Sequence, residues 1–288
     1  MNDVTPTPWQ FVHKAATALT VVRPQSSGSS LVYSLPHSGR YYPDSFVAEA
    51  RPVGSALRAS EDAYVDEIVD LSPQLGVYGL ACHYARAFCD VNRNALELDA
   101  RLIRGELPKA ALSLSSRVKA GFGVIARRLS AQQDIYRHPI DMAEVNLRLD
   151  LIYWPYHVML QRLITEAKAS GPVTLIDWHS MPSAALSQIN GTKPDIVLGT
   201  LHGETCGDGL VQLVKSSLER QGLRVGLNKP FAGGYIVEHY GRPNDGVSAL
   251  QIEINRAIYM DEASLETTAG LYRLKNICRN LTAQLLAG

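Results

Sequence analysis

Short apolar runs rich in β-branched residues alternate with longer amphipathic stretches along almost the whole 288-residue chain. Runs of the first kind predict strands, and stretches with apolar residues three or four apart predict helices. Strands that alternate with helices are typical of an α/β domain around a mixed, mostly parallel sheet flanked by helices. Because no linker or internal repeat interrupts the pattern, we predict a single domain over residues 1–288.

Local patterns place the individual elements. The predicted strands are residues 31–35, 76–84, 173–180, 195–200 and 249–260, with a further β-like segment at 235–237. The predicted helices begin at about Ser60, cover most of 107–170, and recur at 207–222 and from about 263 to 286. Pro155 predicts a kink or a break in the second helix, because proline lacks the backbone donor and its ring clashes with the preceding turn. The glycine pair at 233–234 predicts a tight turn or a close approach of the backbone to a ligand.

Charge and composition exclude several classes of protein. The 28 basic and 28 acidic side chains cancel, so the chain lacks the basic excess of nucleic-acid binders. No apolar run approaches the ~20 residues that cross a bilayer, which argues against a membrane partner. With 46% hydrophobic residues the chain can bury a sizeable core. A small-molecule substrate is the expected partner, and the oligomeric state is left open.

Cysteine usage and the N-terminus predict the compartment. Four cysteines without CxxC spacing are too few for a disulfide scaffold, so reduced, buried thiols are expected. Residues 1–22 lack the basic start and long apolar core of a secretory signal. We therefore expect a cytoplasmic protein.

Three of the strongest predicted strands carry a polar residue at or near the end. SLVYSLPH ends in His37, TLIDWH ends in His179, and LQIEIN contains Glu253. Ligands of open α/β sheets bind at the carboxyl ends of the strands, so these side chains are expected to converge. Two histidines and a carboxylate are what a catalytic zinc requires. The alternative is ordinary, since buried histidines are commonly satisfied by hydrogen bonds within a core.

Acidic residues offer a third ligand and a supporting group. Asp62 and Asp66 are four residues apart, on one face of the predicted helix. Acids in a first helical turn also interact favourably with the helix dipole, which is the alternative interpretation. Asp177, two residues before His179, is placed to orient that histidine or to be satisfied by the backbone.

The stretch DVNRN suggests a carboxylate-binding pair. Asn92 and Arg93 combine an amide with a guanidinium, which suits a bidentate grip on a carboxylate substrate. The alternative is a salt bridge within the loop to Asp90 or Asp99.

Taken together, these motifs resemble the N-formylglutamate amidohydrolase (N-formylglutamate deformylase) family. The matching blocks run in order along nearly the whole chain: SLPHSGRYYP (34–43), EDAYVDEI (61–68), DVNRN (90–94), YWPYH (153–157), LIDWHSMP (175–182), PDIVLGT (194–200), FAGGYIVEHYGRP (231–243) and ALQIEINRAIYMDE (249–262). The family is similar to zinc carboxypeptidases and aspartoacylase-type deacylases. The resemblance implies a zinc-carboxypeptidase-like mixed sheet with helices on both faces and one Zn²⁺ per chain at the strand ends.

The resemblance also implies a set of metal ligands. His37 and His179 match the family's zinc-binding histidines. The related carboxypeptidases take a second ligand three residues after the first histidine, where this chain has Arg40, which cannot ligate. We therefore expect Asp62 to supply it. The other carboxylates of the same block, Glu61 and Asp66, stay open as alternatives.

The remaining roles are likewise implied by the resemblance. Glu253 lies where such folds place the general base, and Asn92 and Arg93 match the pair that holds a substrate carboxylate. Tyr259 and His239 are expected to help hold the substrate or the oxyanion. The chain departs from the family's sequences at Ile236-Val237-Glu238-His239 and at Ala63-Tyr64, which leaves a close N-acyl amino acid open as the alternative substrate.

The implied activity is hydrolysis of N-formyl-L-glutamate, or of a close N-acyl amino acid, to formate and L-glutamate. The family name further implies a place in amino-acid degradation. A carboxypeptidase-like hydrolase or another N-acyl amino acid deacylase with the same metal site is the alternative. A non-catalytic metal-binding or amino-acid-binding protein is a third possibility, against which the retained Glu253 argues.

Overall fold

The computed structural model describes residues 18–25 and 28–287, so most of the N-terminal segment used in the compartment prediction lies outside it. The chain divides into two compact units, each assembled from separate segments. The first contains the described residues up to Thr20, Gly39–Glu61 and Cys82–Met159. The second contains Val21–Ser38, Asp62–Ala81 and the chain from Leu160 onward. A single domain over residues 1–288 stays a prediction.

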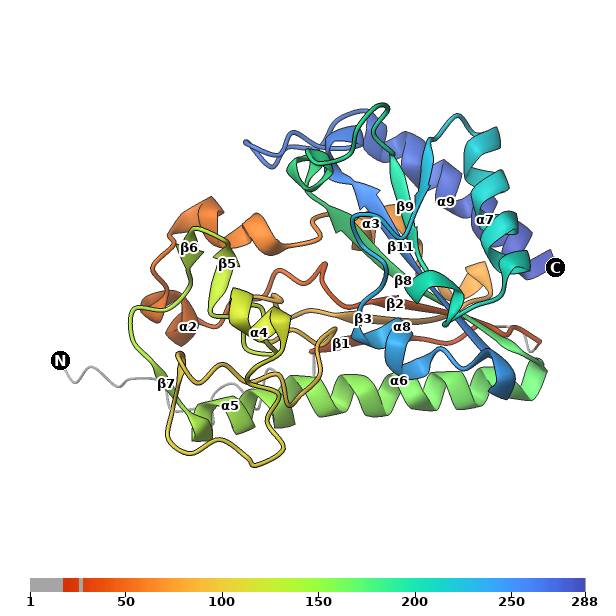
Figure 1. Cartoon of the computed structure of the whole chain (residues 1–288). Helices are drawn as coiled ribbons and strands as arrows, with labels where there is room; N and C mark the ends of the chain where they lie inside the picture. Colours follow the sequence, from red (N-terminus) through yellow and green to blue (C-terminus); the bar gives the residue numbers. More distant parts are fainter. Residues whose placement is uncertain (1–17, 26–27, 288) are drawn as a thin grey trace. The chain divides into compact units, whose positions relative to one another are not determined.

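A seven-stranded sheet, nearly all of it in the second unit, has the order β1-β3-β2-β8-β11-β9-β10 (Figure 1). The strands are β1 (Leu19–Val22), β2 (Leu31–Leu35), β3 (Tyr78–Cys82), β8 (Val173–Met181), β9 (Ile196–Gly199), β10 (Val225–Leu227) and β11 (Val247–Asn255). β2 runs parallel to β3 and β8, β8 to β11, and β9 to β10, whereas β11 and β9 are antiparallel. The predicted α/β fold with a mixed, mostly parallel sheet is confirmed.

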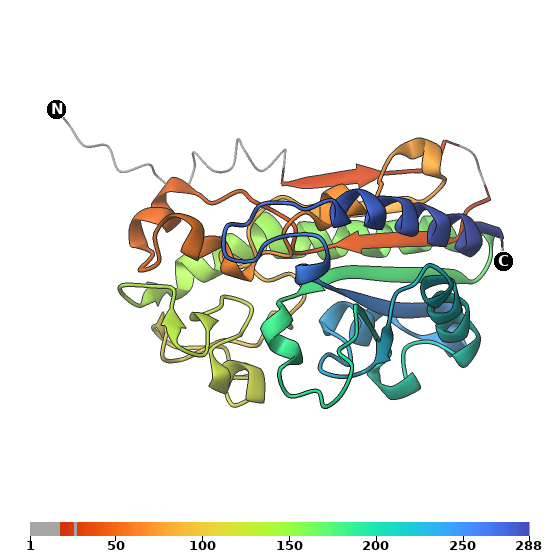
Figure 2. The same cartoon turned by 90° about the horizontal axis from the view of Figure 1, so that it is seen from above.

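Helices cover both faces of this sheet. Apolar side chains of α3 (Val65–Ile68), α7 (Asp208–Arg220) and α9 (Gly270–Ala287) form one core with the strands. Figure 2 shows α9 running along the strands. On the other face α8 (Tyr235–Tyr240) packs against β8 and β11, and the part of α6 (Trp154–Ala167) that belongs to this unit lies on the same side (Figure 1). Among the described residues, no helix is long and apolar enough to span a membrane.

Alternation along the central strands separates an apolar face from a polar one. Ile176 and Trp178 of β8, and Ile252 of β11, point into the core beneath α7 and α9. Because successive side chains of a strand point to opposite faces, Asp177 and His179 point the other way. Glu253 does so on β11, where it is the direct neighbour of His179 in the register. One face of the sheet thus carries buried polar groups.

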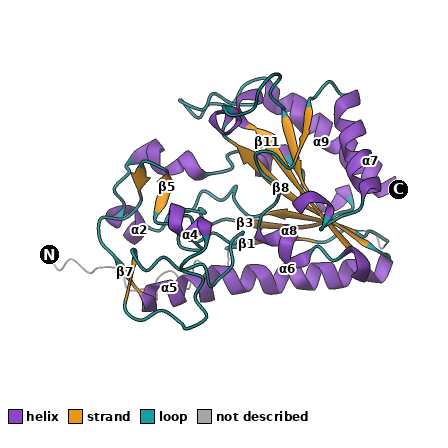
Figure 3. Cartoon of the chain, in the orientation of Figure 1, coloured by secondary structure: helices purple, strands orange, loops and turns teal. Residues whose placement is uncertain are grey.

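The first unit is mostly irregular, with short helices and two small sheets (Figure 3). Its elements are α2 (Asp44–Glu49), β4 (Ile103–Arg104), α4 (Ser116–Ala120), β5 (Arg128–Ser130), β6 (Gln133–Asp134), β7 (Ile140–Asp141) and α5 (Met142–Arg148). The predicted helix over most of 107–170 is therefore wrong before Met142. Gly121, in the left-handed region with φ of 94°, ends α4, and the chain then turns back into the β5–β6 hairpin.

Two other element predictions are wrong. The helix expected from Ser60 is only the four-residue α3, preceded by a 3₁₀ segment, Gly54–Ser60. The β-like segment 235–237 is the start of α8, whose buried Ile236, Val237 and Tyr240 have the spacing of one helical face. A short apolar run does not distinguish a strand from a buried helix, and the sheet contact decides between them.

At Pro155, where a kink or a break is predicted, the helical backbone continues without a break and widens into a π-helical turn just before the proline. A π-helical turn, Leu149–Tyr153, separates α5 from α6, and Pro155 is the second residue of α6. Proline has no backbone N–H to donate to the preceding helical turn. The wider π-helical turn does not need that hydrogen bond and therefore accommodates the proline.

Candidate active site

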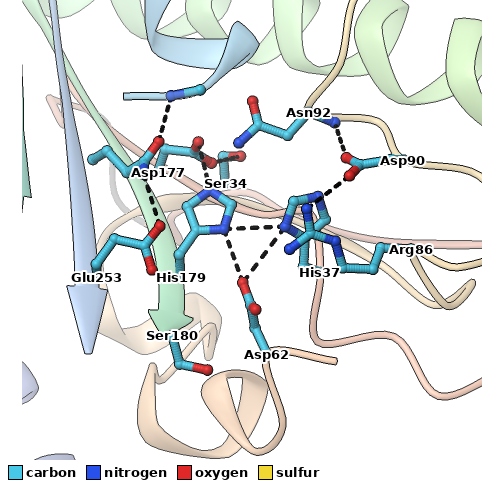
Figure 4. Close-up of polar contacts among 12 residues, drawn as sticks. Ser34, His37, Asp62, Arg86, Asp90, Asn92, Asp177, His179, Ser180 and Glu253 are labelled. Carbon is cyan, nitrogen blue, oxygen red and sulfur yellow. Dashed lines mark hydrogen bonds and ion pairs between the residues drawn. The ribbon is translucent and has the colours of Figure 1, made fainter. Parts of the chain in front are cut away.

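His37, Asp62 and His179 lie together in the second unit, on the polar face of the sheet (Figure 4). One ligand atom from each lies within 4.8 Å of the other two, and all three residues are buried. Nδ1 of His179 is 2.9 Å from Oδ2 of Asp62 and 3.2 Å from Nδ1 of His37. Three nitrogen and oxygen donors that converge in this way could hold a metal ion.

Local backbone contacts bring Asp62 to the end of β2. The amide of Asp62 donates to the carbonyl of His37 at 3.0 Å, which joins the two segments directly. The next residues are fixed as well, because the Tyr259 hydroxyl donates to the carbonyl of Ala63 at 2.7 Å. Tyr64 has a left-handed φ of 65°, and its hydroxyl donates to the carbonyl of Leu265. Strain of this kind persists only where the surroundings hold the residue, and it is common at functional sites.

His179 is held by Asp177, two residues earlier on the same face of β8. The Nε2–H of His179 donates to Oδ2 of Asp177 at 2.8 Å, and the Ser34 hydroxyl donates to the other carboxylate oxygen at 2.6 Å. A carboxylate on the far nitrogen fixes the tautomer and leaves Nδ1 toward Asp62 and His37. The predicted supporting position of Asp177 agrees with this geometry.

The ionisation of these groups reflects their contacts. Burial would lower the pKa of His179, but the carboxylates of Asp177 and Asp62 outweigh it and raise this pKa well above the usual value. Burial would raise the pKa of Asp62, but the hydrogen bonds with His179 and His37 hold it well below its usual range. The site therefore favours positive charge beside an ionised Asp62.

Arg256 adds a buried guanidinium to the site. Its Nη2 donates to Oδ1 of Asp62 at 3.1 Å, and its Nε donates to the Ser180 hydroxyl at 3.1 Å. Around the two histidines there are thus three buried carboxylates, those of Asp62, Asp177 and Glu253, and one buried guanidinium, which contacts Asp62. A metal ion binds only neutral imidazoles, so it would displace the proton that His179 otherwise holds. With both imidazoles neutral, three carboxylates and one guanidinium leave two negative charges in excess, which a divalent cation would offset.

Glu253 is the neighbour of His179 across β8 and β11. It is 7% exposed, and its Oε1 accepts a hydrogen bond from the amide of Gln251 at 2.8 Å. In Figure 4 its carboxylate lies on the same face as His179. This placement is compatible with the predicted general base, which stays a prediction.

The alternatives to Asp62 have other surroundings. The Glu61 carboxylate accepts hydrogen bonds from the Arg58 guanidinium and the Tyr42 hydroxyl. Asp66 is exposed on α3. Of the three carboxylates, Asp62 is the one that lies with the two histidines.

Asn92 and Arg93 belong to the first unit. The Asp90 carboxylate accepts hydrogen bonds from the backbone N–H of Asn92 at 2.9 Å and from the Arg86 guanidinium at 2.7 Å, and the Arg93 guanidinium lies 3.8 Å from it. Arg93 also donates to the carbonyl of Phe122, and burial lowers its pKa. The salt bridge to Asp90, weighed as an alternative, is thus present, and the substrate-binding role of this pair stays a prediction.

Tyr259 and His239 have local contacts in the second unit. Tyr259 is fully buried, and its hydroxyl holds the segment after Asp62. His239 is exposed on α8, where its ring stacks on Tyr235 at 5.1 Å. Their predicted contact with substrate is an open prediction.

Sequence reasoning missed three polar residues of this face: Ser34, Gln251 and Arg256. Ser34 lies inside β2 and Gln251 inside β11. Gln251 has the same two-residue spacing from Glu253 that Asp177 has from His179, which was an available signal. Arg256 lies three residues after Glu253, and the sequence does not show that it reaches Asp62.

The fold and this cluster define an α/β protein whose sheet carries a candidate metal-binding site of two histidines and an aspartate. The model of the N-formylglutamate amidohydrolase family matches residues 29–260, which is most of the chain. The chain belongs to the N-formylglutamate amidohydrolase family.

Individual relatives agree with this membership. An N-formylglutamate deformylase of Pseudomonas aeruginosa is 31% identical over 81% of this chain and 82% of its own length. One from Pseudomonas putida is 28% identical with the same coverage. The crystal structure of an N-formylglutamate amidohydrolase from Ralstonia eutropha superimposes with a TM-score of 0.88 at 32% identity, covering 94% of this chain and 97% of that one.

Proposed function

We propose that this protein is a zinc-dependent amidohydrolase that cleaves N-formyl-L-glutamate to formate and L-glutamate. The observation that carries the proposal is the His37–Asp62–His179 cluster beside Glu253, in a chain of this family. Nitrogen and carboxylate donors in a three-residue set are typical of catalytic zinc, which keeps a further position open. We propose one zinc ion per chain, with His37, Asp62 and His179 as its ligands.

The side chains divide the work of hydrolysis. A bound zinc supplies Lewis-acid activation of the amide oxygen and of water. Glu253 accepts a proton from the attacking water, whose oxygen bonds to the formyl carbon. The C–N bond then breaks, and Glu253 delivers the proton to the departing nitrogen. Acid–base catalysis of this kind contributes typically ~10²–10⁴-fold.

Substrate binding is assigned to a second set of residues. Arg93, with Asn92, anchors a substrate carboxylate, because a planar guanidinium suits bidentate binding. Anchoring the carboxylate fixes the formyl carbon relative to the attacking water, so that the attack takes place within one oriented complex. Tyr259 and His239 keep their proposed role in holding the substrate or the oxyanion. The partner is thus a small N-acyl amino acid, and the proposed location is the cytoplasm.

A formate-release assay on the purified protein tests the substrate. We expect the highest kcat/KM for N-formyl-L-glutamate, lower values for N-acetylglutamate and other N-acyl amino acids, and little cleavage of dipeptides. A preference for dipeptides would favour the carboxypeptidase-like alternative. Undiminished turnover after exhaustive chelation would exclude zinc dependence.

The partner of His179 offers a test of the metal site. We expect Asp177→Asn to lower the affinity for Zn²⁺ by ~10–100-fold, because the imidazole loses the carboxylate that orients it and raises its basicity. Competition with a chelator of known affinity measures this change. Asp195→Asn is the matched control, since Asp195 is also a buried acid of the second unit but pairs with Arg224. Equal zinc affinity for Asp177→Asn and the parent would contradict the assignment.

A further inference from the structure

The side-chain amide of Gln251 joins Glu253 to the turn before α8. Its Oε1 accepts a hydrogen bond from the backbone N–H of Gly234 at 2.6 Å, and its Nε2 donates to Oε1 of Glu253 at 2.8 Å. Gln251 and Glu253 are 4% and 7% exposed. Because only the carbonyl oxygen can accept from Gly234, the NH₂ group must face the carboxylate. The orientation of the amide is therefore determined by its partners.

The same arrangement occurs on the neighbouring strand. Asp177 supports His179, and Gln251 supports Glu253, in both cases from two residues earlier on the same face. The register pairs Gln251 with Asp177 and Glu253 with His179. One row across β8 and β11 thus holds the supporting groups, and the next row holds the groups that they orient.

The turn to which Gln251 is bound is closely packed. The Ala232 carbonyl accepts from the amide of Leu201 at 2.7 Å. Gly233 has φ of 143°, and a Cβ added there would come within 2.8 Å of the Val237 side chain. At Gly199, an added Cβ would lie 2.9 Å from the Ala232 backbone. The N–H of Gly234 is therefore a fixed point and not a mobile loop tip.

We propose that Gln251 is a positioning residue that holds the Glu253 carboxylate for proton transfer by tethering it to Gly234. The proposal rests on the proposed function, in which Glu253 is the general base. A carboxylate on a flexible side chain has several rotamers, and a buried donor on one oxygen selects one of them. Proton transfer needs this selection, because a catalytic group is effective only near its productive geometry.

The variant Gln251→Met, similar in size but without the amide, tests the proposal. We expect it to lower kcat by ~10-fold or more, as loss of a supporting partner does elsewhere, with KM and bound zinc unchanged. In a Glu253→Gln background the same substitution should produce no further loss, because its effect acts through Glu253. Ser248→Ala, on the same strand, is the control and should retain the parent rate. If thermal unfolding shows that Gln251→Met does not fold, Gln251→Leu is used in its place.

Crystal structures of the parent and of Gln251→Met provide a readout that does not need activity. We expect one conformation of Glu253 in the parent and more than one in the variant. If the parent hydrolyses no N-acyl amino acid, the proposed function has failed, and these structures still test the tether. Three results would overturn the positioning role. They are a parent-like kcat in Gln251→Met, a decrease in kcat by the same factor when Gln251→Met is added to Glu253→Gln, and a Glu253 side chain that keeps its single conformation in the variant.

Discussion

The variant His179→Ala is expected to lose both bound zinc and turnover. His179 contacts Asp62 and His37 through Nδ1, so its removal leaves two of the three proposed ligands. Loss of a group that only supports a ligand costs ~10–100-fold in metal affinity, and loss of the ligand itself should cost more. We therefore expect affinity for Zn²⁺ to fall by at least ~10²-fold, with formate release at background. Metal analysis after dialysis, together with the formate assay, measures both.

The control for this variant is His138→Ala. His138 is an exposed histidine of the first unit, so the substitution removes an imidazole without touching the cluster. It should retain zinc and the parent rate. If His179→Ala binds zinc with the parent's affinity, His179 is not a ligand, and the assignment of the zinc ion to this cluster fails.

The sequence predicts polar residues near the carboxyl ends of the strands, because a polar residue late in an apolar run is visible locally. His37, His179 and Glu253 were found in this way, together with the α/β fold of the sheet that carries them. The choice among Glu61, Asp62 and Asp66 was not visible. It depends on the hydrogen bond between the amide of Asp62 and the carbonyl of His37, a long-range contact.

The irregular first unit was the least predictable part. Its chain is fixed by arginines that reach backbone carbonyls and acids distant in sequence, as where Arg127 contacts both Asp99 and Asp134. Arg148 is buried against Phe88 and donates to its carbonyl. Contacts of this kind have no period in the sequence, and hydrophobic spacing alone therefore suggested a helix where the chain forms turns.

The second large effect is expected for Glu253→Gln, which should retain zinc and lower kcat by at least ~10²-fold. The substitution preserves the shape of the side chain, and the new amide oxygen can still accept from Gln251. It removes the carboxylate that we propose as the acceptor of the water's proton. A fall in kcat with an unchanged KM would show that the lost interaction belongs to the transition state rather than to substrate binding.

The matched control is Glu219→Gln, at an exposed glutamate of α7 that pairs with Lys215. It makes the same chemical change on α7, which packs on the face of the sheet opposite to Glu253. It should leave kcat and zinc content at parent values. A binding protein on this fold would have no need of a base, so it would show equal behaviour for the two variants. Rapid turnover in Glu253→Gln with zinc bound would instead require another proton acceptor. Asp62 and Asp177 both contact His179, so replacing either of them should also change zinc binding, whereas Glu253 accepts its hydrogen bond from Gln251. The structure therefore makes Glu253 the carboxylate whose loss should separate zinc binding from catalysis.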